Sequence, residues 1–393
     1  MERYLKKILT AGIHGAGRAL LPNGHWFAWR QAPRSVPQPV RRILVVALHH
    51  IGDVLCATPA LRALRRAHPR ARILAWVKSR AVDVLRDNPD VDELIVFDDV
   101  CTDKTREPPG SWRRKLRFVN ELRSQKFDVL VDLSGVFDSV VLGWLSRARY
   151  RVGFSSQGMG FLFDREAVIS EYDTLSERYN SVVRALGIAV EDRALRFCVS
   201  GEDEKKAAAL LAQSRIDSHD IVVGIHPGAG WRSKCWFPER FAALADALMG
   251  ERQMKVILFG GKSDIALVKD IIARMRHAPV GLAGTLTLGE MAAIMKHCRV
   301  LIGNDSGPAH IAVALNIPCV VLFGPTNPVY HFAASRSLKI LHAKLTCSPT
   351  EGMLHCHNRG AYPCRERICL QHISVTDVLD AVHELMNQSH AED

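Results

Sequence analysis

The segment Gly303-Asn-Asp-Ser-Gly-Pro-Ala-His310 combines residue types that hold anions at the start of a helix. It follows one apolar run and opens another, HIAVAL. Asp305 or Ser306 could cap this helix, and Gly307 would let a ligand approach the backbone. His310 could add a donor to a phosphate oxygen, beside the free N–H groups and the positive end of the helix. The alternative is a well-capped helix with a structural histidine.

A second candidate anion-binding segment, HPGAGWRSKCW, runs from His226 to Trp236 and also follows an apolar run. Gly228 and the small residues beside it predict a flexible turn, and Arg232 and Lys234 supply positive charge next to that turn. A diphosphate leaving group needs such charge to stabilise it as its bond breaks. The alternative is a glycine-rich surface loop.

Asp53 directly follows the first apolar run of the chain and a short polar turn, HHIGD. A carboxylate at the end of a strand and near the start of a helix stays ionised and can accept a proton. Asp53 is therefore a candidate catalytic base, and the alternative is a helix cap. His49 and His50 precede it and are less specific candidates.

Four of the ten cysteines cluster near the C-terminus, at Cys347, Cys356, Cys364 and Cys369. With the nearby histidines they could hold zinc or iron, but their spacing is irregular and lacks a tight CxxC pair. The alternative is a cysteine-rich loop. The neighbouring histidines are His355 and His357.

Apolar runs without alternation predict strands that are buried on both faces, as in a parallel sheet. Such runs begin at Arg42, Arg72, Glu93, Asp128, Ile221, Lys255, Val280, Arg299 and Pro318. Helical stretches alternate with them, so each series predicts a doubly wound parallel sheet. The pattern pauses between about residues 150 and 200. We therefore expect two α/β units, joined near residues 195–215.

Polar and glycine-rich residues follow these predicted strands, where ligands bind in open parallel sheets. The segments are residues 49–53, 226–234, 260–264, 303–310 and 323–327. All but the first lie in the second unit. This asymmetry predicts that the second unit holds a phosphate-rich ligand and that the first supplies something else.

The chain has 393 residues and a formal net charge of +11, of which +7 lies in the first 42 residues. A second basic cluster spans residues 113–126, beginning with Arg113 and Arg114. This charge favours an anionic partner such as a phosphorylated substrate or an anionic membrane surface. The alternative is a solvated surface and a frayed N-terminal tail. Nucleic acid is disfavoured because no zinc-finger, RNP-type or basic heptad pattern accompanies the charge.

No apolar run is long enough to predict a transmembrane helix, and the N-terminus is a poor secretory signal. A cytoplasmic protein is therefore expected. The sequence lacks the GxSxG, HExxH and CxxC motifs, and the Gly-Lys-Ser at 261–263 lacks the first glycine of a P-loop.

Three segments of the chain resemble glycosyltransferase family 9, the bacterial ADP-heptose:lipopolysaccharide heptosyltransferases. They are HHIGDVLCATPALRALRRAHP, HPGAGWRSKCW with the following PERF, and GNDSGPAHIAVALNIPCVVLFGPT, in the family's order. The resemblance covers roughly residues 41 to 385. It implies a GT-B fold, in which two Rossmann-like domains face each other across a cleft and no metal is required.

The resemblance also implies roles for individual residues. The family's catalytic base corresponds to Asp53, and its donor-phosphate lysine corresponds to Lys234. Its donor site at a helix end corresponds to residues 305–307 and His310. Asp264 is the weaker candidate for a ribose contact, because the family often has an acidic residue directly after the glycine pair and Lys262 stands there. One related branch modifies adhesin proteins and uses clustered cysteines for iron.

The sequence thus predicts an inverting transferase of heptose from ADP-heptose to a lipopolysaccharide core acceptor, without a cofactor, in the cytoplasm and in peripheral contact with the inner membrane. The expected parts are a basic leader (1–40), an acceptor domain (41–200), a nucleotide-sugar domain (201–373) and a C-terminal helix (374–393). The acceptor-binding candidates are His49, His50, Arg113 and Arg114. The alternatives are another donor or a protein acceptor, a nucleotide-sugar epimerase, and a non-enzymatic carbohydrate-binding relative.

Overall fold

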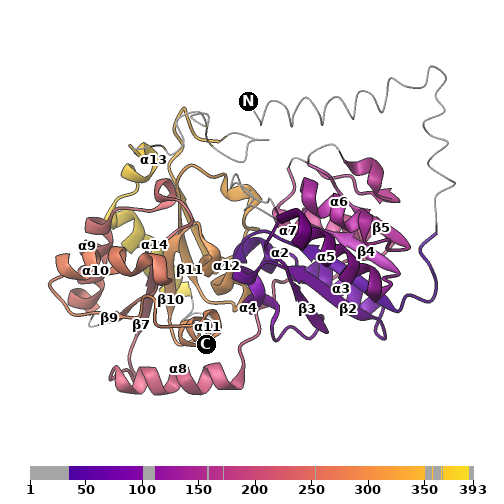
Figure 1. Cartoon of the computed structure of the whole chain (residues 1–393). Helices are drawn as coiled ribbons and strands as arrows, with labels where there is room; N and C mark the ends of the chain where they lie inside the picture. Colours follow the sequence, from indigo (N-terminus) through magenta and orange to yellow (C-terminus); the bar gives the residue numbers. More distant parts are fainter. Residues whose placement is uncertain are drawn as a thin grey trace. The chain divides into compact units, whose positions relative to one another are not determined.

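The computed structural model describes residues 35–100, 111–156, 159–170, 172–252, 254–349, 356, 364 and 366–388. The chain forms two compact units, Met1–Ala194 and Leu195–Asp393. Each unit contains one six-stranded sheet in which all neighbouring strands are parallel (Figure 1). The α/β fold class predicted from the buried apolar runs is confirmed.

The sheet of unit 1 has the strand order β3-β2-β1-β4-β5-β6. Its strands are β1 Arg42–Ala47, β2 Arg72–Val77, β3 Glu93–Val96, β4 Val129–Asp132, β5 Tyr150–Gly153 and β6 Arg165–Glu166. Its helices are α2 Ile51–Cys56, α3 Thr58–Ala67, α4 Val82–Leu85, α5 Ser111–Gln125, α6 Phe137–Leu145 and α7 Leu175–Arg184, with short 3₁₀ turns η2 Ser79–Ala81 and η3 Gly160–Leu162.

Helices cover both faces of the unit 1 sheet. On one face, Phe118 of α5 and Leu142 of α6 pack with Trp76 and alternate residues of β1. The rings of Trp76 and Phe118 lie 4.7 Å apart. Because successive residues of a strand point to opposite faces, Ile43 and Val45 face the other side, and α2, α3 and α7 contact one another in a separate layer.

The sheet of unit 2 repeats this design with the strand order β12-β11-β10-β7-β8-β9. Its strands are β7 Val222–His226, β8 Lys255–Leu258, β9 Val280–Gly281, β10 Val300–Asn304, β11 Cys319–Phe323 and β12 Leu338–His342. Its helices are α8 Gly201–Gln213, α9 Pro238–Arg252, α10 Ile265–Arg274, α11 Leu288–Met295, α12 Gly307–Ala314, α13 Ile368–Gln371 and α14 Val375–Gln388, with η4 Arg232–Lys234, η5 Lys262–Asp264 and η6 Pro328–Tyr330.

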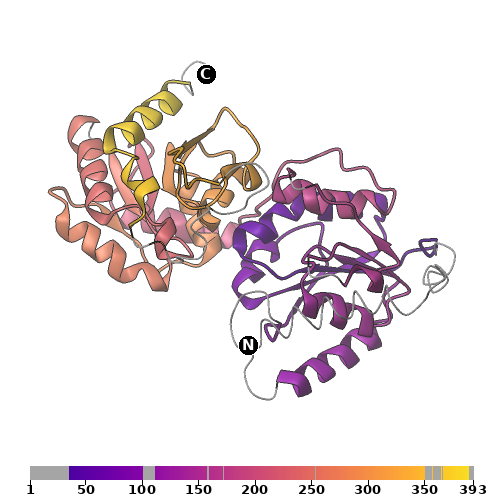
Figure 2. The same ribbon diagram turned by 90° about the horizontal axis from the view of Figure 1, so that it is seen from above.

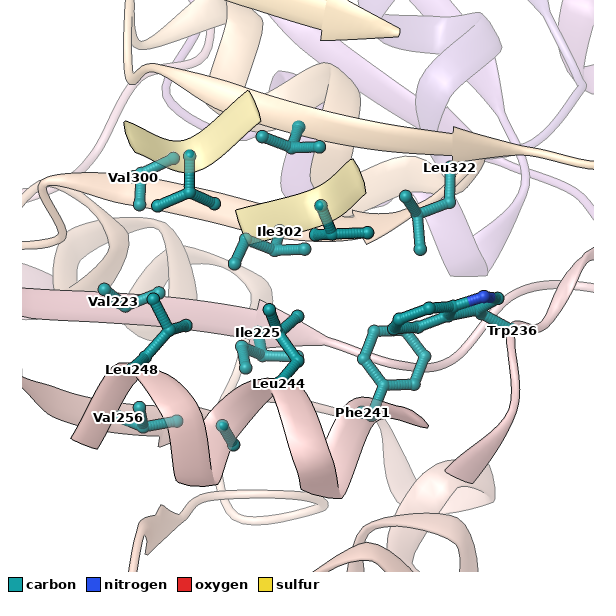
Figure 3. Packing of buried hydrophobic residues seen from close by; sticks show 14 of the residues in the cluster. Val223, Ile225, Trp236, Phe241, Leu244, Leu248, Val256, Val300, Ile302 and Leu322 are labelled. Atoms are coloured by element: carbon teal, nitrogen blue, oxygen red, sulfur yellow. The ribbon is translucent and has the colours of Figure 1, made fainter. Parts of the chain in front are cut away.

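The core of unit 2 forms between β7, β10 and β11 on one side and α9 and α14 on the other. Figure 3 shows Leu244 and Leu248 of α9 below Val223 and Ile225 of β7, with Trp236 at one end of the cluster. The Trp236 and Phe241 rings meet edge to face, 5.0 Å apart. The apolar face of α14 is part of this core through Val378, among others. Figure 2 shows α14 alongside the other helices of the unit.

Several elements differ from the sequence-based expectation. The segment HHIGD is not only a turn, because α2 begins at Ile51 and Asp53 is its third residue. The pause expected between residues 150 and 200 contains β5, β6 and α7, and β12 was also missed. These strands are short or lie at a sheet edge, so they lack the long apolar runs that mark the central strands. Within the described residues, no helix has the length and hydropathy needed to cross a membrane.

Candidate functional site

The loop that carries Lys234 is fixed to the ends of two central strands of unit 2. Trp236 is fully buried, and its backbone N–H donates to Oδ1 of Asn304 at 3.0 Å. The Asn304 amide in turn donates to the carbonyl of Pro227 at 2.7 Å. The Trp236 indole N–H donates to the carbonyl of Ile373 at 3.1 Å. Lys234 therefore sits on a rigid support beside the last residue of β10.

Asp305 directly follows β10 and is the polar centre of this site. Its side chain is buried, and Oδ2 lies 2.5 Å from Nζ of Lys234. The Thr326 hydroxyl, beyond the end of β11, donates to the same oxygen at 2.7 Å. Nε2 of His331 lies 4.0 Å from it. Three side chains thus bring their polar groups to one carboxylate.

Burial alone would raise the pKa of Asp305, but His331, Lys234 and the Thr326 hydroxyl together hold it well below its usual range. The carboxylate is therefore charged at any physiological pH. It fixes one of the three N–H groups of Lys234 and leaves the ammonium able to bind a further anion. The ammonium also lies 4.5 Å from the centre of the Trp231 ring, which limits its rotation.

The start of α12 lies next to this ion pair in sequence. Ser306 is the N-cap residue and has an extended backbone, and Gly307 and Pro308 form the first turn. The expected side-chain cap is wrong, because neither Ser306 nor Asp305 caps the helix and Asp305 is held by Lys234 and Thr326. Within the described part of the chain, the buried Oγ of Ser306 has no hydrogen-bond partner. The first-turn N–H groups and this hydroxyl remain for a ligand.

His310 is buried one turn into α12 and stacks on Phe332, with the ring centres 4.3 Å apart. His331 lies 6.2 Å from His310, ring to ring. Potential ligand atoms of Asp305, His310 and His331 lie within 4.8 Å of one another. A cation there would compete with the Lys234 ammonium for Asp305, which disfavours a metal and favours an anion. His331 was missed because its only sequence signal is its position after β11.

Gly228 and Asp264 meet at the ends of β7 and β8. A Cβ at Gly228 would lie 2.6 Å from the Asp264 carboxylate, so only glycine fits this approach. Asp264 accepts from the backbone N–H of Gly261 at 2.9 Å and lies 4.0 Å from Nε2 of His226. Burial lowers the pKa of His226, and the Asp264 charge only partly opposes this effect.

In unit 1, Asp53 is held at the start of α2. Its Oδ2 accepts from the backbone N–H of His50 at 2.8 Å, so the carboxylate does serve the helix start. The residue is only half-buried, which leaves the carboxylate accessible. Both properties suit a group that must be fixed and yet reach a substrate.

Asp132, the last residue of β4, was not singled out from the sequence. It is fully buried and accepts from the N–H groups of Ser134 and Gly135, at 2.8 and 3.0 Å. The Ser139 hydroxyl also donates to it, at 2.7 Å. Burial raises the pKa of Asp132 to about 6, against the lowering effect of these hydrogen bonds and of His49. A charged residue ending an apolar strand was its only sequence signal.

The four acceptor-binding candidates do not share one set of contacts. His49 lies 3.0 Å, through Nε2, from the carbonyl of Ser134, and His50 is exposed beside Asp53. Arg114 on α5 forms an ion pair with Asp99, and the Arg113 guanidinium lies 5.2 Å from the centre of the Trp112 ring. The histidines thus belong to the end of β1, whereas the arginines belong to the first turn of α5.

The four clustered cysteines line one pocket, together with Ser233 and Arg367: Cys347, Cys356, Cys364 and Cys369. Burial raises the pKa of Cys369 to about 11, and the other three thiols add to the effect. Among the described residues, the group of three potential ligand atoms within 4.8 Å of one another is Asp305, His310 and His331, and the cysteines form no such group. His355 and His357 lie outside the described residues.

Residues 115–359 match the model of glycosyltransferase family 9 (heptosyltransferase). The chain is 28% identical to lipopolysaccharide heptosyltransferase 3 of Escherichia coli over 286 residues, which cover 71% of this chain and 82% of that protein. It is also 23% identical to lipopolysaccharide heptosyltransferase 1 of Campylobacter coli, over 88% of this chain and 98% of that protein.

Solved structures give the same result for the fold. A glycosyltransferase family 9 protein from Veillonella parvula has a TM-score of 0.78 and 26% identity, with 90% of this chain and 100% of that chain covered. The E. coli ADP-heptose lps heptosyltransferase II has a TM-score of 0.71 and 22% identity, with 89% and 99% covered. The two parallel sheets are thus those of a GT-B fold, as the resemblance implied.

Proposed function

This chain belongs to glycosyltransferase family 9, and from that premise we propose that it transfers a heptose from ADP-heptose to a lipopolysaccharide core acceptor. The curated relatives named above are lipopolysaccharide heptosyltransferases, and the solved relative from E. coli is an ADP-heptose lps heptosyltransferase. The chain spans more than four fifths of these relatives, so the whole activity is the natural inference.

We assign the nucleotide-sugar donor to unit 2. The observation that carries this assignment is the ion pair of Lys234 with the buried Asp305, directly before the start of α12. Lys234, the Ser306 hydroxyl and the N–H groups at Gly307 would bind the diphosphate, with His310 beside them. As the bond from the sugar breaks, negative charge grows on the diphosphate, so these groups stabilise the transition state more than the bound donor. Gly228 and Asp264 would lie toward the ribose.

We assign the general base to Asp53 in unit 1. The Asp53 carboxylate would take the proton from an acceptor hydroxyl as that oxygen attacks the anomeric carbon of the heptose. The new carbon–oxygen bond forms as the bond to the diphosphate breaks, and ADP leaves with the electron pair. A single displacement of this kind inverts the configuration at the anomeric carbon. The reaction needs no metal or other cofactor.

We place the acceptor, an anionic glycolipid, with unit 1, where His49 and His50 stand beside the proposed base. The enzyme would work in the cytoplasm and touch the inner membrane surface peripherally, since its acceptor is anchored there. The expected basic leader (1–40) falls almost wholly outside the described residues. We propose that residues 41–200 form the acceptor domain, residues 201–373 the nucleotide-sugar domain and residues 374–393 the C-terminal helix.

A nucleotide panel tests the donor assignment. Isothermal titration with ADP, UDP and GDP should give tightest binding for ADP, and Lys234→Ala should weaken it by roughly 10- to 100-fold, the worth of a charge-assisted hydrogen bond. Arg232→Ala is the matched control, because Arg232 is an exposed cation in the same short turn. Equal, weak binding of all three nucleotides would contradict the assignment of the ADP-sugar donor to unit 2.

A further inference from the structure

Unit 1 exposes a group of large apolar side chains on α5, α6 and η3. They are Trp112 (59% exposed), Leu116 (52%), Phe137 (39%), Trp144 (45%) and Phe161 (51%). Among the described residues, two tryptophan side chains are more than a third exposed, and both belong to this group. Monomeric soluble proteins scatter such residues singly, so a local concentration marks a surface that meets something apolar.

Helical spacing places these side chains on common faces. Trp112 and Leu116 are four residues apart on α5, and Phe137 and Trp144 are seven apart on α6, so each pair lies on one side of its helix. The two helices contact each other, and α6 also contacts η3. The remaining apolar residues of α5, such as Phe118 and Leu122, point into the core. The exposed residues are therefore additional to those that hold α5 on the sheet.

Two of the basic residues near the start of α5 form ion pairs, and two others lie exposed on the helix surface. Nζ of Lys115 lies 3.1 Å from Oδ2 of Asp138 on α6, and Arg114 is paired with Asp99. Arg113 and Arg117 are exposed and four residues apart, so they share a stripe beside Trp112 and Leu116. The Lys115–Asp138 pair also joins α5 to the first turn of α6, so the two helices that carry the exposed apolar side chains are held together.

We propose that this α5/α6 surface docks on an anionic lipid membrane, with the aromatic and leucine side chains entering the headgroup boundary and Arg113 and Arg117 binding lipid phosphates. Tryptophan with arginine is the combination that membrane interfaces favour, because the indole is apolar with one polar edge and the guanidinium binds phosphate. The one exposed acid on the same stripe, Glu121, lies a turn beyond Arg117.

The role of this membrane contact rests on the proposed function, because the enzyme would meet a membrane-anchored acceptor at the lipid surface. Binding of the α5/α6 surface to lipid does not depend on that function. Vesicle binding needs neither donor nor acceptor, so its failure is distinguishable from a failure of the transferase proposal, which the nucleotide titration tests separately.

Co-sedimentation of the full chain with vesicles of 70% phosphatidylcholine and 30% phosphatidylglycerol tests the proposal. The variant Arg113→Glu/Arg117→Glu should lower the partition coefficient at least tenfold, since one arginine near an anionic surface contributes roughly fivefold. Trp112→Ser/Trp144→Ser should lower it by about tenfold or more. Raising the salt concentration should weaken vesicle binding by the wild type. It should also reduce the difference in partition coefficient between the wild type and the arginine variant.

Two controls keep the outcome decisive. Arg70→Glu removes an exposed cation in the turn after α3, outside the α5/α6 layer, and Val168→Ser removes an exposed apolar side chain beyond β6. Both should bind vesicles like the wild type, and all variants should keep the wild-type affinity for ADP. Wild-type binding by both surface variants would overturn the proposal. So would a wild-type dimer in solution that only the tryptophan variant dissociates, because the surface would then be an interface between copies.

Discussion

Asp305 is buried, charged and shared by several donors, and the Lys234 ammonium is the one that lies closest to it. A buried ion pair is costly to break from one side, because the remaining charge loses its partner in a low-dielectric setting. Removing both charges together leaves neither side chain as a buried charge without a partner. The pair can therefore be separated experimentally into a structural part and a ligand-binding part.

A double-mutant cycle makes that separation. Lys234→Met should destabilise unit 2 by about 3–5 kcal/mol, the usual result of leaving one charge buried and unpaired. Adding Asp305→Asn should restore most of the stability, but ADP binding should stay weak in the double variant. Urea unfolding and calorimetry measure the two quantities. Additive losses of stability would mean that the two side chains do not interact.

Asp132 behaves in the opposite way, since burial raises its pKa to about 6 in the folded protein from near 3.9 in an unfolded chain. Between these two values the folded state binds more protons than the unfolded state. Stability therefore falls as the pH rises from about 4 to about 6, and the loss persists above that range.

Asp132→Asn should remove this pH-dependent loss. The amide oxygen can still accept from Ser134 and Gly135, and Ser139, whose hydroxyl also lies 2.9 Å from the Val136 carbonyl, can accept from the new amide N–H. The variant should exceed the wild type by roughly 1–3 kcal/mol at pH 8 and match it near pH 4. Thermal unfolding across that range measures this, and a difference that is constant with pH would refute the assignment.

At the scale of elements, Arg240 of α9 binds the segment around α13. The Arg240 guanidinium donates to the carbonyls of Leu370, Gln371 and Ile373, at 3.3, 2.7 and 2.6 Å. Carbonyls at the end of a helix otherwise lack partners. The tie holds α13 against the segment that carries Trp236, and so it supports the position of Lys234.

Arg240→Ala should destabilise unit 2 by about 1–3 kcal/mol, because several carbonyls lose a charged donor. Its effect on ADP affinity should be small, since Trp236 keeps its own hydrogen bonds to Asn304 and Ile373. Circular dichroism melting and calorimetry check the two parts. A large loss of ADP affinity with unchanged melting would mean that Arg240 contacts the ligand directly.

The sequence predicts the central elements of both sheets because buried parallel strands carry long apolar runs, as in β1, β7 and β10. The strands that it misses, such as β6 and β12, lie at sheet edges or are short, and their pattern is weak. The starts of helices were harder still. Aspartate is a common helix-capping residue, but the Asp305 carboxylate instead accepts hydrogen bonds from Lys234 and Thr326, which are distant in sequence.

The same limit applies to the site. Residues that share a sequence motif, such as those at 303–310, could be predicted together. His331 could not, because it stands alone in sequence and its partner Asp305 follows another strand. Asp132 could not, because its hydrogen-bond donors lie in its own following loop and no motif marks them. Arg113 and Arg114 show the converse, since adjacent residues with the same charge have different surroundings.

At the scale of the whole molecule, each unit carries half of the proposed chemistry. Unit 2 holds the cationic and helix-end groups suited to a leaving diphosphate, and unit 1 holds a fixed, accessible carboxylate after its first strand. Two similar sheets thus present different chemistry at the carboxyl ends of their strands. Loss of the proposed base should therefore leave donor binding intact.

Transfer of heptose by the Asp53→Asn variant tests this expectation most directly. Mass spectrometry would follow heptose addition to a lipopolysaccharide precursor with ADP-heptose as donor, and calorimetry would measure ADP affinity in the same preparations. We expect the wild type to add one heptose, and the variant to bind ADP equally well but to transfer heptose about 10²- to 10⁴-fold more slowly. Transfer by Asp53→Asn at nearly the wild-type rate would contradict the assignment of Asp53 as the base.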